Sequence, residues 1–320
     1  MSVIHPDPNL RPVAGARREP PLDVEDMAAS EGAAPSLPQA PRTLGSILVE
    51  TGRLTPADVS RVLAVQRESG LRFGEVAVGL ELLTNEQLES ALAEQYRYPY
   101  LVPGHSNVSG LVVMAYQPFG RQAEAVRALR TQMSMQWLNR ADRAGTKTLA
   151  ITSLDSGDGR SWLAANLAVA MSQLGERTLL IDADMRRPVQ HTLFDVENGV
   201  GLSGLLVGKA GATAIQRVRQ LPSLAILPAG AVPPNPQELL TSRAFSQVLE
   251  KLAASYDAII IDTPPAGEFA DAHVISGRSS ATVVVMRQHR SELQRLEELM
   301  ESLKRAGAQV VGAVLADREH

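Results

Sequence analysis

Short runs of aliphatic residues alternate with segments of helical character between residues 148 and 315. Strands separated by helices imply a parallel sheet with right-handed crossovers. The sequence therefore predicts an α/β fold with a mostly parallel sheet flanked by helices, preceded by a helix over 122–138. The expected strands cover residues 148–152, 178–181, 224–227, 258–261, 281–286 and 310–315.

A turn of small residues, Ser153-Leu-Asp-Ser-Gly-Asp-Gly-Arg-Ser161, follows the first expected strand and precedes a helix. Gly157 and Gly159 allow a tight turn whose N–H groups face an anion, and the helix N-terminus adds the positive end of its dipole. The Ser161 hydroxyl is placed to bind Mg²⁺. Alone, this motif is also explained by a strand–turn–helix junction without a ligand.

Carboxylates end two further aliphatic runs. Leu179-Leu-Ile is followed by Asp182 and Asp184, and Ala258-Ile-Ile-Ile is followed by Asp262. The carboxyl ends of parallel strands meet in the crevice beside such a turn, where carboxylates can hold Mg²⁺ and orient a nucleophile. The combination favours a Mg²⁺–nucleotide site.

These segments together resemble a known family, the bacterial tyrosine kinases of the exopolysaccharide type, and in particular the cytoplasmic chain-length-determinant kinases of polysaccharide export loci. The resemblance covers about residues 113–315 and implies a P-loop NTPase fold. The matching segments are Ser153–Ser161 (Walker A), Leu179–Arg186 (Walker A′), Ile259–Asp262 (Walker B), Glu124–Arg130 and Pro233–Leu240.

The resemblance implies an ATP-dependent protein-tyrosine kinase that uses Mg²⁺ and regulates exopolysaccharide polymerisation, chain length and export. Asp182 would be a metal-linked carboxylate or the base for an incoming tyrosine, and Asp184 and Asp262 would complete the metal site. Arg186 would position phosphate or acceptor, and Arg160 would act on the transferred phosphate. The expected phosphate-binding residues are Ser156, Gly157, Asp158, Gly159, Arg160 and Ser161.

Partners also follow from the resemblance. Glu124, Arg127 and Arg130 match a Glu-x-x-Arg-x-x-Arg helix through which these kinases pack into rings. Their activity depends on the cytoplasmic segment of a membrane polysaccharide co-polymerase. The chain is therefore expected to be cytoplasmic and recruited to the inner face of the cell membrane, with itself, the co-polymerase and a tyrosine-bearing protein as partners.

Two departures from the family pattern keep a second function open. Arg160 stands where a P-loop normally has Lys, and its planar fork reaches phosphate differently. The family's tyrosine-rich C-terminal tail is missing. The segment Tyr96-Arg-Tyr-Pro-Tyr100 is either a relocated phosphoryl acceptor or an amphipathic packing segment. The alternative is a nucleotide-dependent regulatory adaptor with little kinase activity. An ATPase resembling the partitioning and septum-placing proteins is disfavoured because Leu154 and Asp155 stand where those proteins carry an early Lys.

An internal repeat precedes this domain. Residues 43–66 align with residues 72–95, and Thr55 and Thr84 each resemble a helix N-cap. The sequence predicts a small helical domain over 42–100 that resembles the N-terminal domain of type II secretion and pilus ATPases. The resemblance implies a cyclic di-GMP site, although Thr43 replaces an opening Arg and Glu81 replaces a Gly. A docking module without ligand is the alternative. The matching residues are Gly45, Gly52, Gln66, Arg72, Gly74 and Gln95.

Composition limits the remaining choices. Residues 1–41 hold eight of the 20 prolines and are expected to be a disordered tail, and residues 101–120 are expected to be a linker to the domain over 121–320. A net charge of −4 argues against bulk nucleic-acid binding, and the lack of cysteine excludes disulfides and thiolate metal sites. The sequence has no secretory signal and no apolar stretch near the roughly 20 residues of a membrane span.

Overall fold

The computed structural model describes residues 43–95, 99–101, 104–117, 119–138, 147–288 and 292–316. The proline-rich segment over 1–41, together with Tyr96 and Tyr98, lies outside these ranges. Within them, no helix combines the length and the apolar character that a membrane crossing requires.

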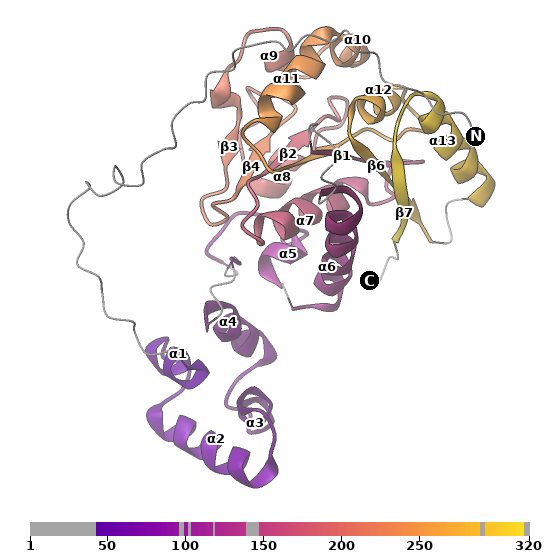
Figure 1. Cartoon of the computed structure of the whole chain (residues 1–320). Coiled ribbons are helices and arrows are strands. Elements are labelled where there is room, and N and C mark those ends of the chain that lie inside the picture. Colours follow the sequence, from indigo (N-terminus) through magenta and orange to yellow (C-terminus); the bar gives the residue numbers. More distant parts are fainter. Residues whose placement is uncertain are drawn as a thin grey trace, which may run out of the picture. The chain divides into compact units, whose positions relative to one another are not determined.

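A seven-stranded sheet forms the centre of the α/β domain, in the order β3-β4-β2-β5-β1-β6-β7 (Figure 1). Every expected strand is present to within one residue at each end. Strand β3 was not predicted; it has only two residues and pairs antiparallel with β4, while the other neighbouring strands are parallel. The strands are β1 (Thr148–Ser153), β2 (Thr178–Asp182), β3 (Gln216–Arg217), β4 (Leu224–Leu227), β5 (Ala258–Asp262), β6 (Ala281–Arg287) and β7 (Val310–Ala316).

Helices lie on both faces of the sheet (Figure 1). The helix expected over 122–138 begins one residue earlier as α6 and ends in a π-helical turn over Ser134–Leu138. The helices of this domain are α5 (Val113–Tyr116), α6 (Arg121–Met133), α7 (Arg160–Ser172), α8 (Gln190–Phe194), α9 (Leu202–Leu206), α10 (Pro236–Thr241), α11 (Arg243–Ala253), α12 (Asp271–Arg278) and α13 (Leu293–Arg305).

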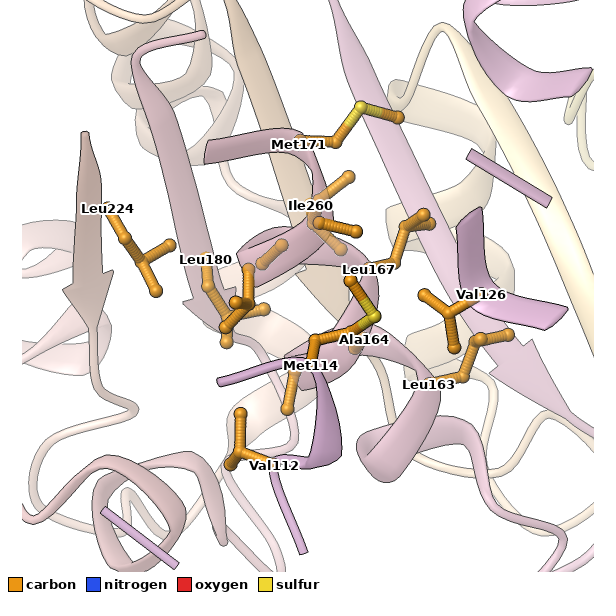
Figure 2. Packing of buried hydrophobic residues seen from close by; sticks show 14 of the residues in the cluster. Val112, Met114, Val126, Leu163, Ala164, Leu167, Met171, Leu180, Leu224 and Ile260 are labelled. Carbon is orange, nitrogen blue, oxygen red and sulfur yellow. The ribbon is translucent and has the colours of Figure 1, made fainter. Parts of the chain in front are cut away.

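Helix α7 is the central element of one face of the sheet. Its residues are nearly all buried, and Leu163, Leu167 and Met171 pack among side chains of β2 and β5 (Figure 2). The helix starts directly at the glycine turn, so its burial fixes the position of the phosphate-binding loop. The opposite face is packed by a second cluster that includes Leu240 and Phe245 from α10 and α11.

The segment over 101–120, expected to be a linker, contributes buried side chains to the α/β core. Val112 and Met114 are fully buried in the same cluster as α7 (Figure 2). Two buried polar side chains, Asn166 of α7 and Gln173 directly after that helix, bind the backbone of this segment. Asn166 accepts from Met114 N at 2.9 Å and donates to Leu111 O at 3.1 Å, and Gln173 donates to Met114 O at 2.8 Å. These partners are far apart in the sequence, so local composition did not reveal the packing.

The front helical unit repeats its structure as well as its sequence. Helices α1 (Leu44–Glu50) and α3 (Phe73–Gly79) both span seven residues, and each is followed by a longer helix, α2 (Pro56–Ser69) or α4 (Asn85–Gln95). The predicted N-caps are present, because Thr55 forms a capping box with Asp58 and Thr84 exchanges the same two bonds with Gln87. The unit has its own apolar cluster, in which Ile47, Leu48 and Val62 are fully buried.

Candidate functional site

The phosphate-binding loop follows β1 and adopts the conformation that its glycines allow. Gly157 and Gly159 have φ angles of 85° and 96°, in the left-handed region that side chains with a Cβ disfavour. Inside the turn, the Asp158 carboxylate accepts from Asp155 N at 2.9 Å, and Ser153 Oγ donates to Asp155 O at 2.8 Å. Helix α7 then begins at Arg160, so its free N–H groups face the turn.

The loop after β5 lies directly against this turn. Gly267 N donates to Leu154 O at 3.0 Å, and a Cβ on Gly267 would approach that oxygen to 2.4 Å, which only glycine avoids. The next residue, Glu268, accepts from Ser156 N at 3.1 Å, and its other oxygen lies 3.9 Å from Arg187 Nη1. The Glu268 carboxylate thus occupies the Ser156 N–H, a backbone donor of the phosphate-binding loop.

Arg160 is directed into the sheet edge. Its side chain is only 8% exposed; Nη2 donates to Asp184 Oδ2 at 2.6 Å and Nε donates to Thr263 O at 2.5 Å. The distance from Nε to Asp262 Oδ1 is 4.0 Å. The guanidinium therefore neutralises part of the acidic cluster that ends β2 and β5.

Asp182 and Asp262 are register partners on the neighbouring strands β2 and β5. Both are fully buried. Asp182 Oδ1 accepts from Asp184 N at 3.2 Å, and Oδ2 accepts from Val189 N at 3.0 Å and from Gln190 N at 2.9 Å. The first turn after β2 is therefore folded around the Asp182 carboxylate.

Burial raises the pKa of both carboxyl groups. The pKa of Asp182 lies well above its usual range because the group is desolvated and lies near the Asp262 charge, which outweigh its backbone hydrogen bonds. Burial raises the pKa of Asp262 to about 6, although the Arg160 charge, Gln190 and Ser161 act in the opposite direction. Burying two charged carboxylates side by side is therefore unfavourable unless a proton or a nearby cation offsets part of their charge.

Gln190 connects these groups to the phosphate-binding loop. Its Nε2 donates to Asp262 Oδ2 at 2.7 Å and to Ser161 O at 3.0 Å, while its backbone N–H binds Asp182. The side chain is fully buried at the start of α8. One residue thus contacts Ser161, Asp182 and Asp262, three of the four expected metal-site residues.

Arg186 is directed to Asp271, the first residue of α12. Nε and Nη2 donate to the two carboxylate oxygens at 2.8 and 3.1 Å, and the guanidinium lies 4.4 Å from the centroid of the Phe269 ring. Beside it is a cavity of about 360 Å³ lined by Arg186, Pro234–Glu238 and Thr241. Its expected role toward phosphate or acceptor stays a prediction.

The structure brings together most of the residues that the sequence singled out. Arg160 and Asp184 are paired, and Ser161, Asp182 and Asp262 meet at Gln190. Glu124 and Arg127 lie elsewhere, as an ion pair on α6. Sequence reasoning missed Thr263, Glu268, Asp271 and Gln190. A polar residue six positions after Asp184 was the only available signal for Gln190.

The site fits a hydrated Mg²⁺ ion on its own chemistry. Asp262 Oδ1 and Gln190 Oε1 are buried acceptors without a hydrogen-bond partner among the described residues. Buried acceptors need a donor or a cation, and oxygen ligands with retained water are what Mg²⁺ prefers. Ser161 lies beside them at the start of α7.

The fold and the site define a P-loop nucleotide-binding domain, and residues 146–311 match the AAA domain family. The chain is 34% identical over 204 residues to the tyrosine-protein kinase YwqD of Bacillus subtilis, covering 64% of this chain and 84% of that protein. It is 36% identical to the tyrosine-protein kinase CpsD of Streptococcus agalactiae, covering 53% of this chain and 74% of that protein. The chain therefore belongs to the bacterial tyrosine-protein kinase family.

Solved structures and a longer relative agree with this assignment. The chimeric protein CapA2B2 matches with a TM-score of 0.60 and 33% identity, over 72% of this chain and 99% of that one. The kinase domain of the Escherichia coli tyrosine kinase ETK matches with a TM-score of 0.61 and 32% identity, over 65% and 81%. The tyrosine-protein kinase wzc of Salmonella typhi is 34% identical over 60% of this chain, which spans 26% of that protein.

Proposed function

We propose that this protein is an ATP-dependent protein-tyrosine kinase that regulates exopolysaccharide polymerisation, chain length and export. One observation carries the proposal: in a chain of the tyrosine-kinase family, the glycine turn before α7 and the buried carboxylates Asp182 and Asp262 are joined by direct hydrogen bonds through Gln190. A phosphate-binding loop beside buried carboxylates is the arrangement that phosphoryl transfer requires.

The residues have distinct roles in this proposal. The N–H groups of the turn over 156–161 hold the phosphates, and Ser161 and Asp262 hold Mg²⁺ directly or through water. When bound, Mg²⁺ neutralises charge on the phosphates. Nη2 and Nε of Arg160 are engaged inside the sheet edge, so these two donors reach a phosphate only when Arg160 leaves Asp184 and Thr263.

The reaction transfers the terminal phosphoryl group of ATP to a tyrosine hydroxyl. The phenolic oxygen forms a bond to phosphorus, the bond to the ADP oxygen breaks, and the phenolic proton passes to a carboxylate. Asp182 is the proposed acceptor of that proton, because burial and the Asp262 charge raise its pKa and a base with a raised pKa takes up a proton readily.

Transfer of ³²P from [γ-³²P]ATP to tyrosine tests the proposal. Wild type, Asp182→Ala and the exposed control Glu301→Gln are compared with and without the cytoplasmic segment of a membrane co-polymerase. The proposal expects labelling by wild type and Glu301→Gln and a loss of at least about 100-fold in Asp182→Ala, the scale on which general bases contribute. No Asp182-dependent labelling under any condition would reject it.

A second function, a nucleotide-dependent regulatory adaptor with little kinase activity, is favoured by the Arg160–Asp184 pair. A cation held by a carboxylate at 2.6 Å is withdrawn from the phosphates. The adaptor predicts nucleotide binding without tyrosine transfer in wild type, with transfer gained in Arg160→Lys. The labelling experiment separates the two functions when Arg160→Lys is added to the proteins compared.

Self-association through α6 is part of the proposal. Glu124 Oε2 pairs with Arg127 at 2.5 Å, and the Glu124 side chain is 71% exposed. Arg130 instead donates to Ala170 O at 3.2 Å, so it also anchors α6 to α7. A ring is expected to dissociate in Glu124→Ala/Arg127→Ala, as measured by light scattering with Mg²⁺–ADP, and an unchanged mass would contradict an interface here. The proposed membrane partner is the polysaccharide co-polymerase.

For the front unit we propose a docking module, with a cyclic di-GMP site as the alternative. Packing accounts for two of the matching glycines: a Cβ at Gly74 would lie 2.7 Å from Leu88 Cδ2, and one at Gly45 would lie 3.2 Å from Val59 Cγ1. Glu81 adopts the left-handed conformation, with φ 58°, where the first copy has Gly52. Calorimetric titration of the full chain with cyclic di-GMP decides between the two: heat that Arg72→Ala abolishes would establish the sensor.

A further inference from the structure

Gln190 joins the phosphate-binding turn to the buried carboxylates, but the function proposed above gives its side chain no chemical role. It is fully buried, and its amide nitrogen donates to both Asp262 Oδ2 and Ser161 O. Its backbone N–H also holds Asp182. It therefore spans the ends of β2 and β5 and the first turn of α7.

Its neighbours determine the orientation of the amide. Both groups within hydrogen-bond distance of Nε2 are acceptors, a carboxylate oxygen and a backbone carbonyl. A flipped amide would place Oε1 against these two acceptors, which is unfavourable. Oε1 is therefore directed away from them, and it is buried with no hydrogen-bond partner in the described part of the chain.

A second unpartnered acceptor lies in the same cluster. Asp262 Oδ1 is buried and has no hydrogen-bond partner among the described residues, and Arg160 Nε lies 4.0 Å from it. Two buried acceptors on directly bonded side chains can each take a hydrogen bond from a donor outside the protein. Water held by Mg²⁺ supplies strong donors and fits a cluster of oxygen ligands.

We propose that Gln190 is a positioning residue for Mg²⁺–nucleotide binding: its amide nitrogen fixes Asp262 relative to Ser161, and its amide oxygen, with Asp262 Oδ1, accepts hydrogen bonds from Mg²⁺-bound water. This inference rests on the Mg²⁺–nucleotide site of the proposed function. It does not depend on whether the phosphoryl group reaches a tyrosine.

Glutamine suits this role for chemical reasons. It supplies a donor and an acceptor at once without adding a charge beside Asp262. Glutamate would place a second carboxylate at the 2.7 Å contact with Asp262, and leucine would fill the space but remove both hydrogen-bonding groups. Residues that orient metal ligands typically change metal affinity 10- to 100-fold when replaced.

Calorimetric titration of the full chain with ADP, in excess Mg²⁺ and in excess EDTA, tests the inference. The quantity compared is the ADP affinity in Mg²⁺ divided by the ADP affinity in EDTA, called the Mg²⁺ ratio below. In Gln190→Leu we expect this ratio to fall at least about tenfold, with the Mg²⁺-free affinity changed less than about threefold. Gln190→Glu should also lower the ratio.

Gln173→Leu is a matched control. Gln173 is a buried glutamine directly after α7 whose Nε2 also donates to two oxygens, Pro99 O and Met114 O, away from the site. It should lower the melting temperature about as much as Gln190→Leu does and leave the Mg²⁺ ratio at the wild-type value.

Each other outcome overturns the inference. A wild-type ratio in Gln190→Leu would remove Gln190 from Mg²⁺ binding, and equal losses with and without Mg²⁺ would reduce it to shaping the loop. A wild-type protein whose ADP affinity does not depend on Mg²⁺ would overturn both the site and the inference. Absent tyrosine labelling with a normal, Gln190-dependent ratio would overturn the kinase activity alone and support the inference.

Discussion

Arg160 and Asp184 form a buried ion pair, with Nη2 and Oδ2 2.6 Å apart and both side chains less than a tenth exposed. The pair joins the start of α7 to the segment after β2, across the site where a nucleotide would bind. Removing one partner of such a pair leaves an uncompensated charge, which is more costly than losing both.

We therefore predict that Arg160→Ala lowers the free energy of unfolding by about 3 kcal/mol, because Asp184 is left buried without its counter-ion. Arg160→Ala/Asp184→Asn should recover most of that loss. Urea unfolding of the two variants, with the exposed-pair variant Arg305→Ala as a control, measures this. A double variant less stable than Arg160→Ala would contradict the prediction.

The pH dependence of stability follows from the raised pKa of Asp262. The group has a pKa of about 6 in the folded protein, above its ordinary value of 3.8, so the folded state binds more protons between these values. Its contribution to the free energy of unfolding is therefore most favourable at low pH, where the group is protonated, and is lost as the pH rises through about 6. Asp262→Asn should therefore raise the melting temperature by about 2–4 °C at pH 7.5, the shift produced by about 1 kcal/mol. The gain should shrink at pH 5, and a gain that is larger at pH 5 than at pH 7.5 would be incompatible with this cause.

Glu268 competes with a nucleotide for the phosphate-binding loop. Its carboxylate accepts from Ser156 N at 3.1 Å, so it adds negative charge where phosphates are expected. Glu268→Gln should tighten Mg²⁺–ATP binding by about three- to tenfold, because a like charge at a partly exposed site is worth about 1 kcal/mol. Titration calorimetry at two salt concentrations checks this. The difference from wild type should decrease at high salt, and weaker binding in the variant would show that the carboxylate supports the loop instead.

The close contact between Gly267 and Leu154 holds the loop after β5 against the phosphate-binding loop. A Cβ at Gly267 would approach Leu154 O to 2.4 Å, and backbone cannot move aside as a side chain can. Gly267→Ala should lower stability by about 1–3 kcal/mol and weaken nucleotide binding. Gly199→Ala, where a Cβ meets nothing within 4 Å, should have little effect. Thermal unfolding of both proteins, with and without ADP, compares them.

The sequence by itself determined the parallel strands, the glycine turn and the carboxylates at the strand ends, because these features depend on residues adjacent in the chain. Aliphatic runs such as 258–261 indicate a buried strand wherever they lie, and Gly157 and Gly159 favour a left-handed turn before any partner is known. Strand β3 was not predicted, because its two residues are extended only through their pairing with β4.

Only the tertiary structure decided which side chains meet. The order β2-β5-β1 places Asp182 beside Asp262, which are far apart in the chain, and brings Gln190 against both Asp262 and the start of α7. It also turned Arg160 toward Asp184, and it bound the backbone of Met114 to Asn166 and Gln173. Hydrogen bonds and ion pairs form between neighbours in space, and the folding of the sheet determines which residues become neighbours.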